Sequence, residues 1–336
     1  MQYPASPRRS RPLRAGLAAC LALAIPFGAT AAEFDPVVLD AVVSLSSKVP
    51  SDARTANNLG TEREGNGVLI DGSGLVLTIG YLILEASDVT LRFNNGRSVP
   101  AKPVAYDHAS GFGLVRAAVA PNVKPVALGN SKALQEKDPV IVAGAGGRES
   151  AAAAYVVSRR AFAGAWEYLL EDAVFTAPAY RQFGGAALFS TEGQLVGIGS
   201  LLVPNAIRPD VPVPGNMFVP IEKLTPIMAD LLTTGRRAGA ARPWLGVSTE
   251  EMRGRLIVGF VQPEGPAAKA GIKPGDLVLG VRGEPVAGLA DFYRKMWAVG
   301  PAGATVPITI LDGMTVREVG VRSIDRNNWL RINPSY

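Results

Sequence analysis

The fold is decided by two short apolar runs around a glycine-rich turn, in the stretch GNGVLIDGSGLVLTIGYLI at residues 65–83. The first run ends at Ile70 and the second begins at Leu75, so Asp71–Gly74 separates them. An Asp-Gly pair between apolar runs is a strong signal for a β-hairpin, because glycine supplies the positive φ that a tight turn needs. The stretch therefore predicts two antiparallel strands.

The same pattern of short apolar runs and turns continues from about Phe34 to Ile221. Further turn signals stand around Gly96 and Gly193, each between two apolar runs. The 336 residues include 37 glycines and 26 prolines but only 7% aromatics, which is typical of a turn-rich β protein rather than a helix bundle. We therefore predict a mainly β fold, a sandwich or barrel, for residues 33–222.

A second compact unit is predicted after a helix and linker at residues 223–242. Residues 243–323 combine four apolar runs, typical of strands, with one amphipathic helix. The apolar side chains of that helix share one face at i, i+3, i+4, i+7 and i+8: Leu289, Phe292, Tyr293, Met296 and Trp297. The spacing of apolar residues from Ile221 to Leu232 likewise predicts a helix there. Residues 324–336 form a C-terminal tail.

The first 32 residues are predicted to be a secretory signal peptide rather than part of the fold. Basic residues precede an uncharged apolar run from Ala15 to Phe27, and residues 29–31 have the small side chains of a cleavage site. The run is shorter than the ~20 residues that cross a bilayer, so no membrane span is expected. Cys20 lies in a lipobox-like context, but the apolar run continues beyond it, which disfavours anchoring as a lipoprotein.

Charge and side-chain content exclude several classes of function. The leader holds four of the 34 basic residues and no acidic one, so after cleavage 30 basic side chains stand against 29 acidic ones. No basic stripe then supports nucleic-acid binding. Cleavage also removes the single cysteine, and His108 is the single histidine, so neither a disulfide nor a Cys/His metal site is expected. The glycine cluster Gly144–Gly147 lacks the Lys-Ser/Thr of a phosphate loop, and no cofactor is expected.

Three motifs lie close together in the second unit. They are WLGV at residues 244–247, GPAAKAGIKPGDLV at residues 265–278 and VRGEPV at residues 281–286. Together they resemble a PDZ domain of the bacterial, protease-linked kind. The resemblance implies that backbone N–H groups of one loop receive the terminal carboxylate of a peptide, which then adds a strand to the sheet edge. The expected loop residues are Trp244, Leu245, Gly246 and Val247, and the expected groove walls are Phe292 and Met296.

Three motifs of the first unit bear on chemistry: LTIGYLI at residues 77–83, DHASGFGLV at residues 107–115 and FGGAAL at residues 183–188. With the opening stretch they resemble the chymotrypsin-fold half of HtrA-type, DegP-like periplasmic serine proteases. The resemblance implies a chymotrypsin-like double β-barrel followed by the PDZ domain, which is a small α+β unit. It also places Tyr81 at the family's catalytic His, Gly111 at its Asp and Phe183 at its Ser.

The side chains at those three positions predict that the chain is a pseudoprotease and not an enzyme. Acyl transfer in this fold needs a nucleophile, a base and a group that orients the base. Phe183 has no nucleophilic atom, Tyr81 with an ordinary pKa of about 10 is a poor base at neutral pH, and Gly111 has no side chain. His108 lies in the loop beside Gly111 and is expected to be solvated. No relocated triad is therefore predicted.

The expected function is binding of peptides or protein C-termini by the PDZ domain, as an adaptor, scaffold or quality-control factor. The expected place is the periplasm, or outside the cell, after cleavage of the signal peptide. Two alternatives stay open: a serine-type endopeptidase with a divergent active site, and a regulatory subunit of an active homologous protease. The family commonly forms trimers, so a homo-oligomer is a further possible partner. The rings of Tyr81 and Phe183 are expected to pack together in the cleft between the barrels.

Overall fold

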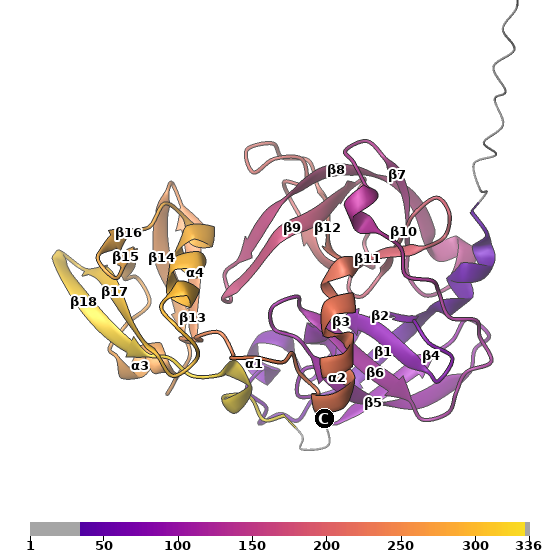
Figure 1. Ribbon diagram of the computed structural model, residues 1–336, viewed down its shortest axis with the longest axis horizontal. Coiled ribbons are helices and arrows are strands. Elements are labelled where there is room, and N and C mark those ends of the chain that lie inside the picture. Colours follow the sequence, from indigo (N-terminus) through magenta and orange to yellow (C-terminus); the bar gives the residue numbers. More distant parts are fainter. Residues whose placement is uncertain (1–33, 333–336) are drawn as a thin grey trace, which may run out of the picture. The chain divides into compact units, whose positions relative to one another are not determined.

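The computed structural model describes residues 34–332, whose helices and strands are labelled in Figure 1. Residues 34–332 belong to one compact unit. The predicted signal peptide, Cys20 within it, and the last four residues of the predicted tail lie outside the described residues. Among the helices of residues 34–332, none is long and apolar enough to cross a membrane.

The first six strands close into an antiparallel barrel in the order β1-β2-β3-β6-β5-β4. The predicted hairpin at residues 65–83 is confirmed, because Val68 pairs with Leu77 in it. Asp71 accepts hydrogen bonds from the backbone N–H groups of Ser73 and Leu75, at 2.9 and 2.8 Å, and so closes the turn. The strands are β1 (Val42–Lys48), β2 (Glu62–Leu69), β3 (Leu75–Ile79), β4 (Asp88–Arg92), β5 (Ser98–Tyr106) and β6 (Phe112–Ala117).

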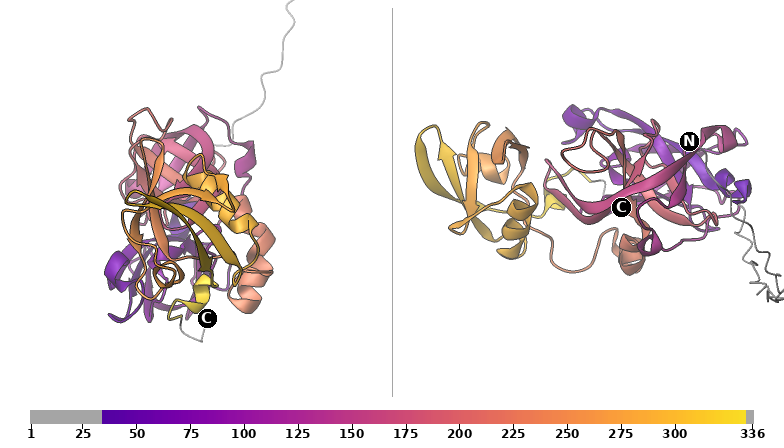
Figure 2. Two further views of the ribbon diagram at one scale, coloured as in Figure 1. Left: turned by 90° about the vertical axis from the view of Figure 1, so that its left-hand side faces the viewer. Right: turned by 90° about the horizontal axis from the view of Figure 1, so that it is seen from above.

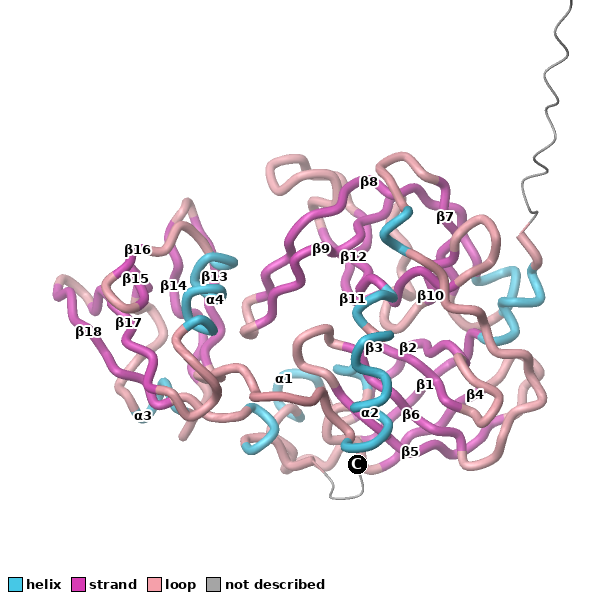
Figure 3. The backbone as a smooth tube through the Cα atoms, in the orientation of Figure 1, coloured by secondary structure: helices cyan, strands magenta, loops and turns pink. Residues whose placement is uncertain are grey.

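The next six strands close into a second barrel in the order β10-β11-β12-β9-β8-β7. Strands β8 and β9 form a long hairpin that pairs as far as Gly164 and Tyr168, and residues 165–167 make its turn. Figure 3 shows strand as the prevailing structure throughout. The strands are β7 (Pro139–Ala143), β8 (Ala151–Gly164), β9 (Tyr168–Ala177), β10 (Ala187–Phe189), β11 (Leu195–Val203) and β12 (Gly215–Pro220).

A third sheet, orange to yellow in Figure 2, has the order β13-β14-β15-β17-β18, with β16 paired to β15. Helix α4 (Leu289–Ala298) confirms the predicted amphipathic helix, and α3 (Pro266–Lys269) follows the turn after β14. The strands are β13 (Val247–Met252), β14 (Arg255–Val261), β15 (Leu277–Val281), β16 (Glu284–Pro285), β17 (Thr305–Asp312) and β18 (Thr315–Arg322). Strand β13 is an edge of this sheet and pairs with β14 on one side, so its other side is the one that could pair with a further strand.

Buried apolar side chains hold these elements together. The barrels share a large cluster that includes Leu45, Leu77 and Phe112, and a separate cluster fills the third sheet around Phe292 and Met296. Each such side chain contributes about 1.5–3 kcal/mol by its removal from water. The predicted fold class is confirmed: the protein is mainly β, with a chymotrypsin-like double barrel followed by a small α+β unit.

The helix predicted from Ile221 to Leu232 is shorter than its apolar spacing indicates. Two 3-10 turns, η5 (Ile221–Lys223) and η6 (Thr225–Ile227), come first, and α2 (Met228–Thr234) alone is an α-helix. Pro226 has no N–H group to donate to the preceding turn, so an α-helix cannot run through it. The remaining short elements are η1 (Pro36–Ala41), α1 (Ala56–Leu59), η2 (Gly80–Leu82), η3 (Ser131–Ala133), η4 (Gly147–Ser150) and η7 (Arg326–Asn328).

Candidate functional site

A cavity of about 640 Å³ brings together the three positions that the sequence singled out. Tyr81, Gly111 and Phe183 line it on the side of the barrels, and Val247 and Phe260 line it on the side of the third sheet. Four further aromatic rings also line it: Tyr106, Trp166, Tyr168 and Trp244. The cavity is therefore a largely apolar space that a polypeptide side chain can enter.

Tyr81 does not stack on Phe183 as expected, since the two rings are not among the aromatic pairs of residues 34–332. The tyrosine lies in η2, and its hydroxyl donates a hydrogen bond of 2.9 Å to the backbone oxygen of Ser200 in β11. That bond connects η2 in the first barrel with β11 in the second. Burial raises the pKa of Tyr81 further above its ordinary value, so the phenol stays protonated at neutral pH.

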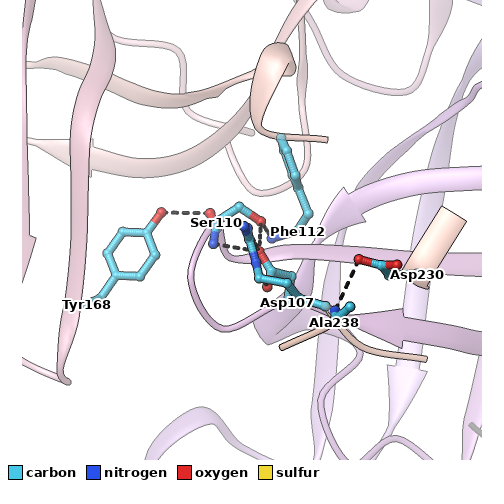
Figure 4. A network of polar contacts seen from close by, with 7 residues as sticks. Asp107, Ser110, Phe112, Tyr168, Asp230 and Ala238 are labelled. Atoms are coloured by element: carbon cyan, nitrogen blue, oxygen red, sulfur yellow. Dashed lines mark hydrogen bonds and ion pairs between the residues drawn. The ribbon is translucent and has the colours of Figure 1, made fainter. Parts of the chain in front are cut away.

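Gly111 lies in a tight turn, and polar contacts of Asp107 and Ser110, drawn in Figure 4, hold this turn in place. Its φ of 82° is a conformation that favours glycine, and its N–H donates a 2.7 Å hydrogen bond to the backbone oxygen of Asp107. The Asp107 carboxylate accepts from the Ser110 hydroxyl at 2.6 Å and from Arg237 at 2.8 Å. Tyr168 in turn donates to the Ser110 backbone oxygen at 2.7 Å. The Asp107 carboxylate thus orders the turn.

Replacing Asp107 with asparagine is expected to destabilise the protein by about 2–4 kcal/mol, because it leaves the buried turn without its ion pair. Burial alone raises the pKa of Asp107, but hydrogen bonds from Arg237 and Ser110 outweigh it and lower the pKa below the ordinary value. This contribution to stability is therefore present at neutral pH and is lost as the pH falls through the lowered pKa. Urea unfolding of both proteins at pH 7 and near pH 3 measures it.

The control for Asp107 is Asp210, whose ion pair with Arg208 is exposed on both sides. Replacing Asp210 with asparagine is expected to change the free energy of unfolding by less than about 1 kcal/mol. Equal effects of the two substitutions would contradict the role assigned to the Asp107 ion pair.

The segment around Phe183 is fixed by an asparagine from the first barrel. Asn66 in β2 donates through Nδ2 to the backbone oxygens of Gln182 and Gly184, at 2.8 and 3.1 Å. Its Oδ1 accepts from the N–H of Ala145 at 2.8 Å. Phe183 itself is half-buried and lines the cavity. The position that the motif aligned with a nucleophile is thus a rigid part of the wall.

His108 is not the solvated loop residue that the sequence predicted. Its ring is half-buried, lies edge-on to Tyr106 at 4.4 Å between ring centroids, and has Nε2 2.8 Å from Oδ1 of Asn327. Burial and the nearby Arg326 lower the pKa of His108 to about 3. The imidazole therefore stays neutral and serves to connect the turn with η7.

The loop that the sequence assigned to a peptide carboxylate already binds a carboxylate from within the chain. Glu167, at the tip of the β8–β9 hairpin, accepts through Oε1 from the N–H groups of Gly246 and Val247, at 2.7 and 3.0 Å. Its Oε2 accepts from the N–H of Leu245 at 3.0 Å. Gly246 has a φ of 78°, which turns successive N–H groups toward one point. Residues 245–247, the carboxylate loop, therefore have the geometry of a carboxylate site.

The other predicted groove residues lie around this loop. Trp244 pairs with Ile324 through backbone hydrogen bonds and packs on Trp329, with the ring centroids 5.5 Å apart. Phe292 and Met296 are fully buried in the cluster of the third sheet, to which Leu169 of β9 also belongs. Their role as walls of a peptide groove stays a prediction.

Glu167 is the functional residue that sequence reasoning missed. It stands in a three-residue turn between two strands, where an acidic side chain is ordinary, and 78 residues separate it from Leu245. The burial of its side chain is what marks it, since only 7% of the residue is exposed. Acidic residues are seldom so buried without a specific partner.

Raising the pH from about 5 to 8 is expected to weaken the docking of Glu167. Burial raises the pKa of Glu167 to about 7, against the opposing effects of the loop N–H groups and Arg326; Tyr293 of α4 also faces it. Because the docked carboxyl holds its proton to higher pH than a solvated one, stability falls between these pKa values as pH rises, by up to about 1.4 kcal/mol per pH unit.

Thermal unfolding of the natural protein and of Glu167→Gln, followed from pH 5 to pH 8, measures this effect. The stability of the natural protein relative to Glu167→Gln is expected to decrease as the pH rises. Parallel curves over that range would contradict the assignment.

No metal centre emerges from residues 34–332, where no three or more His, Cys, Asp and Glu side chains lie together in a way that could hold an ion.

Comparison with known families gives the two parts their names. A model described as a trypsin-like peptidase domain matches residues 65–198, and a model described as a PDZ domain matches residues 243–322. The chain is similar in sequence to DegP proteins, which are its distant homologues. The domain boundaries predicted from the sequence stay a prediction.

Individual relatives of this DegP/HtrA homologue are distant but cover most of it. The periplasmic serine endoprotease DegP of Escherichia coli (strain K12) is 27% identical over 271 residues, which are 75% of this chain and 55% of DegP. A probable DegP-like periplasmic serine endoprotease of Pseudomonas fulva is 25% identical over 270 residues, with the same coverage of 75% and 55%. The chain thus spans about half the length of the curated relatives it matches.

A solved structure shares the fold. A variant of the HtrA-type protease AlgW with a tripeptide has a TM-score of 0.53 and 18% identity, and the match covers 89% of this chain and 96% of that one. At this identity the likeness concerns the fold alone.

The homology corrects the expectation that the chain is not an enzyme. The relatives are serine endoproteases, and the peptidase model matches across all three singled-out positions. The prediction of inactivity rests only on the side chains at three aligned positions. A serine-protease site, however, is defined by the geometry of a nucleophile and its base rather than by sequence position, so Tyr81, Gly111 and Phe183 do not by themselves decide the matter.

Proposed function

We propose that this DegP/HtrA homologue binds the C-termini of polypeptides through its PDZ domain. The observation that carries the proposal is the convergence of three consecutive backbone N–H groups, from Leu245 to Val247, on a single carboxylate. Donors arranged in this way bind a carboxylate without a cationic side chain, as backbone N–H nests do. A free peptide C-terminus presents the same group.

Strand β13 supplies the second part of the binding mode. It begins at Val247, directly after the loop, and forms one edge of the third sheet. A peptide whose carboxylate sits in the loop would extend along this edge and form backbone hydrogen bonds with it. The groups that recognise the ligand are therefore mostly backbone atoms, which suits the binding of many different sequences.

A peptide array tests the proposal. The full chain is applied to decapeptides with free C-termini and to the same decapeptides with amidated C-termini. Amidation removes the negative charge and is expected to weaken binding by about tenfold or more, since charge-assisted hydrogen bonds are the strong ones. Equal binding of free and amidated peptides would overturn the proposal.

A second candidate function is a serine-type endopeptidase with a divergent active site, which the relatives favour. Apart from its tyrosines, the cavity offers three hydroxyl side chains in its lining: Thr55, Ser200 and Ser248. A nucleophile among them would need a base other than His108, whose ring is bonded to Asn327. The aligned position Phe183 supplies no nucleophile.

Cleavage of unfolded casein by the purified chain, together with labelling by a serine-directed phosphonate, tests this function. Cleavage and labelling that are lost in one of the variants Thr55→Ala, Ser200→Ala or Ser248→Ala would identify the nucleophile. Absence of both, with the natural protein folded, would count against the endopeptidase.

The location of the protein in the cell is inferred from the same two relatives, whose names describe them as periplasmic. We place the chain in the periplasm after removal of residues 1–32. Association into a homo-oligomer, or with an active homologous protease as a regulatory subunit, would be seen by light scattering and by co-purification from the native host. A purely monomeric protein that recovers no homologue would count against both associations.

A further inference from the structure

The tip of the β8–β9 hairpin occupies the carboxylate loop in the manner of a bound peptide. The turn residues are Ala165, Trp166 and Glu167, and Glu167 has a positive φ of 59°. Its carboxylate receives the N–H groups of Leu245, Gly246 and Val247 at 2.7–3.2 Å. Every donor that the loop offers to a terminal carboxylate is therefore already bonded.

The backbone of the hairpin tip also takes the place of an added strand. The N–H of Thr249 in β13 donates to the backbone oxygen of Ala165 at 3.0 Å. This N–H lies on the open side of the edge strand, since β13 pairs with β14 on its other side. One carboxylate contact and one strand-type hydrogen bond together reproduce the two features by which a sheet edge holds a peptide end.

Helix α4 and the core of the third sheet complete the contact. The Tyr293 hydroxyl donates to the backbone oxygen of Gly164 at 2.8 Å and accepts from the N–H of Glu167 at 3.1 Å. Leu169, just beyond the turn, is buried in the same cluster as Phe292 and Met296. The hairpin tip thus contacts the groove on three sides: the loop at residues 245–247, the edge of β13 and helix α4.

We propose that the β8–β9 hairpin tip is an internal ligand of the PDZ groove, with Glu167 standing in for a terminal carboxylate, and that a polypeptide C-terminus binds by displacing it. This inference rests on the proposed function, because it concerns the same loop. It adds that the groove is closed in the ligand-free chain and that affinity is set by a competition.

The hairpin tip and a free peptide compete for the groove, and the tip has the advantage of being tethered in the same chain. A ligand tethered in the same chain acts at an effective concentration of the order of millimolar, so a free peptide is at a disadvantage. The apparent affinity is the intrinsic affinity multiplied by the fraction of molecules whose groove is open. Against this, Glu167 is a buried carboxylate that forms no ion pair within residues 34–332, so its docking carries a desolvation cost that limits its hold.

The test compares the full chain with two variants of the same hairpin. Glu167→Ala removes the internal carboxylate. Glu171→Ala is the matched control, because Glu171 also bonds α4, through Arg294 at 2.6 Å, but it is exposed and does not contact the loop. All three proteins are applied to the array of free and amidated decapeptides. Fluorescence anisotropy with the most strongly bound free-carboxylate decapeptide then measures the dissociation constants.

Glu167→Ala is expected to bind this peptide at least about tenfold more tightly than the natural protein, and Glu171→Ala within about twofold of it. Equal affinity of Glu167→Ala and the natural protein for free-carboxylate peptides would overturn the internal ligand and leave the proposed function standing. Absence of carboxylate-dependent binding in all three proteins would overturn the proposed function, and the inference with it.

Hydrogen exchange on the natural protein tests the displacement without any substitution. At saturating peptide the amide of Glu167, which donates to the Tyr293 hydroxyl in the docked hairpin, is expected to exchange at least about tenfold faster, while those of Leu245–Val247 stay protected by the new ligand. Unchanged exchange at the hairpin tip under saturation would overturn the proposal, whatever the folding of the variants.

Discussion

Gly185→Ala is expected to be among the most damaging single substitutions in the barrels, with a loss of at least about 4 kcal/mol in the free energy of unfolding. Gly185 has a φ of 73°, and a Cβ there would lie 1.9 Å from the backbone oxygen of Asn66 and 2.7 Å from Oγ1 of Thr78. Asn66 and Thr78 belong to β2 and β3 of the first barrel, whereas Gly185 leads into β10 of the second. The two barrels would have to move apart to admit one methyl group.

Gly96→Ala is the control for Gly185→Ala, because it has the cost of a left-handed backbone conformation without a steric clash. Gly96 has a similar φ of 83°, but no atom lies within 4 Å of a Cβ placed there. Its replacement is expected to cost about 1–2 kcal/mol, the usual penalty of a left-handed conformation. Urea unfolding followed by circular dichroism gives both values, and equal losses would show that the barrels absorb the extra atom at Gly185.

Phe292→Ala is expected to destabilise the PDZ domain by about 3–5 kcal/mol, the usual cost of removing a fully buried phenylalanine ring. Phe292 lies in α4, is fully buried, and shares its cluster with Met296 and with Leu169 of the hairpin. The cavity left behind would loosen both the third sheet and the docking of the hairpin tip. Thermal unfolding of the full chain is expected to show a separate, earlier transition for this domain.

Phe260→Ala is the control within the same domain, because that ring is 40% exposed in β14 and lines the cavity rather than the core. Its loss is expected to cost less than about 1.5 kcal/mol and to leave a single transition. Similar losses of stability for Phe292→Ala and Phe260→Ala would contradict the role of Phe292 as a core residue of the domain.

The carboxylate loop and the cleft of the barrels share one cavity, which joins the two proposed functions. Gly246 and Val247 line it together with Tyr81 and Phe183. Trp166, next to Glu167, also belongs to its wall. A polypeptide that displaces the hairpin tip therefore changes the space above Phe183, so binding and cleavage have to be measured on the same full chain.

Local pattern accounts for the parts of the fold that the sequence predicted well. Asp71–Gly74 closes its hairpin by contacts within five residues, and the apolar face of α4 follows directly from helical spacing. The same spacing failed at Ile221–Leu232, where Pro226 breaks the hydrogen-bond pattern that the apolar positions alone would support. The spacing of apolar residues predicts which side chains are buried, but it does not show which backbone groups can form the hydrogen bonds of a helix.

The sequence by itself determined the two kinds of domain and the loop whose N–H groups suit a carboxylate. Those features depend on residues that are neighbours along the chain, such as Leu245, Gly246 and Val247. Only the tertiary structure decided what the loop holds, since Glu167 reaches it across 78 residues or more. Such a contact forms when two separately folded elements pack together and exclude water from a charged group, and no local spacing records it.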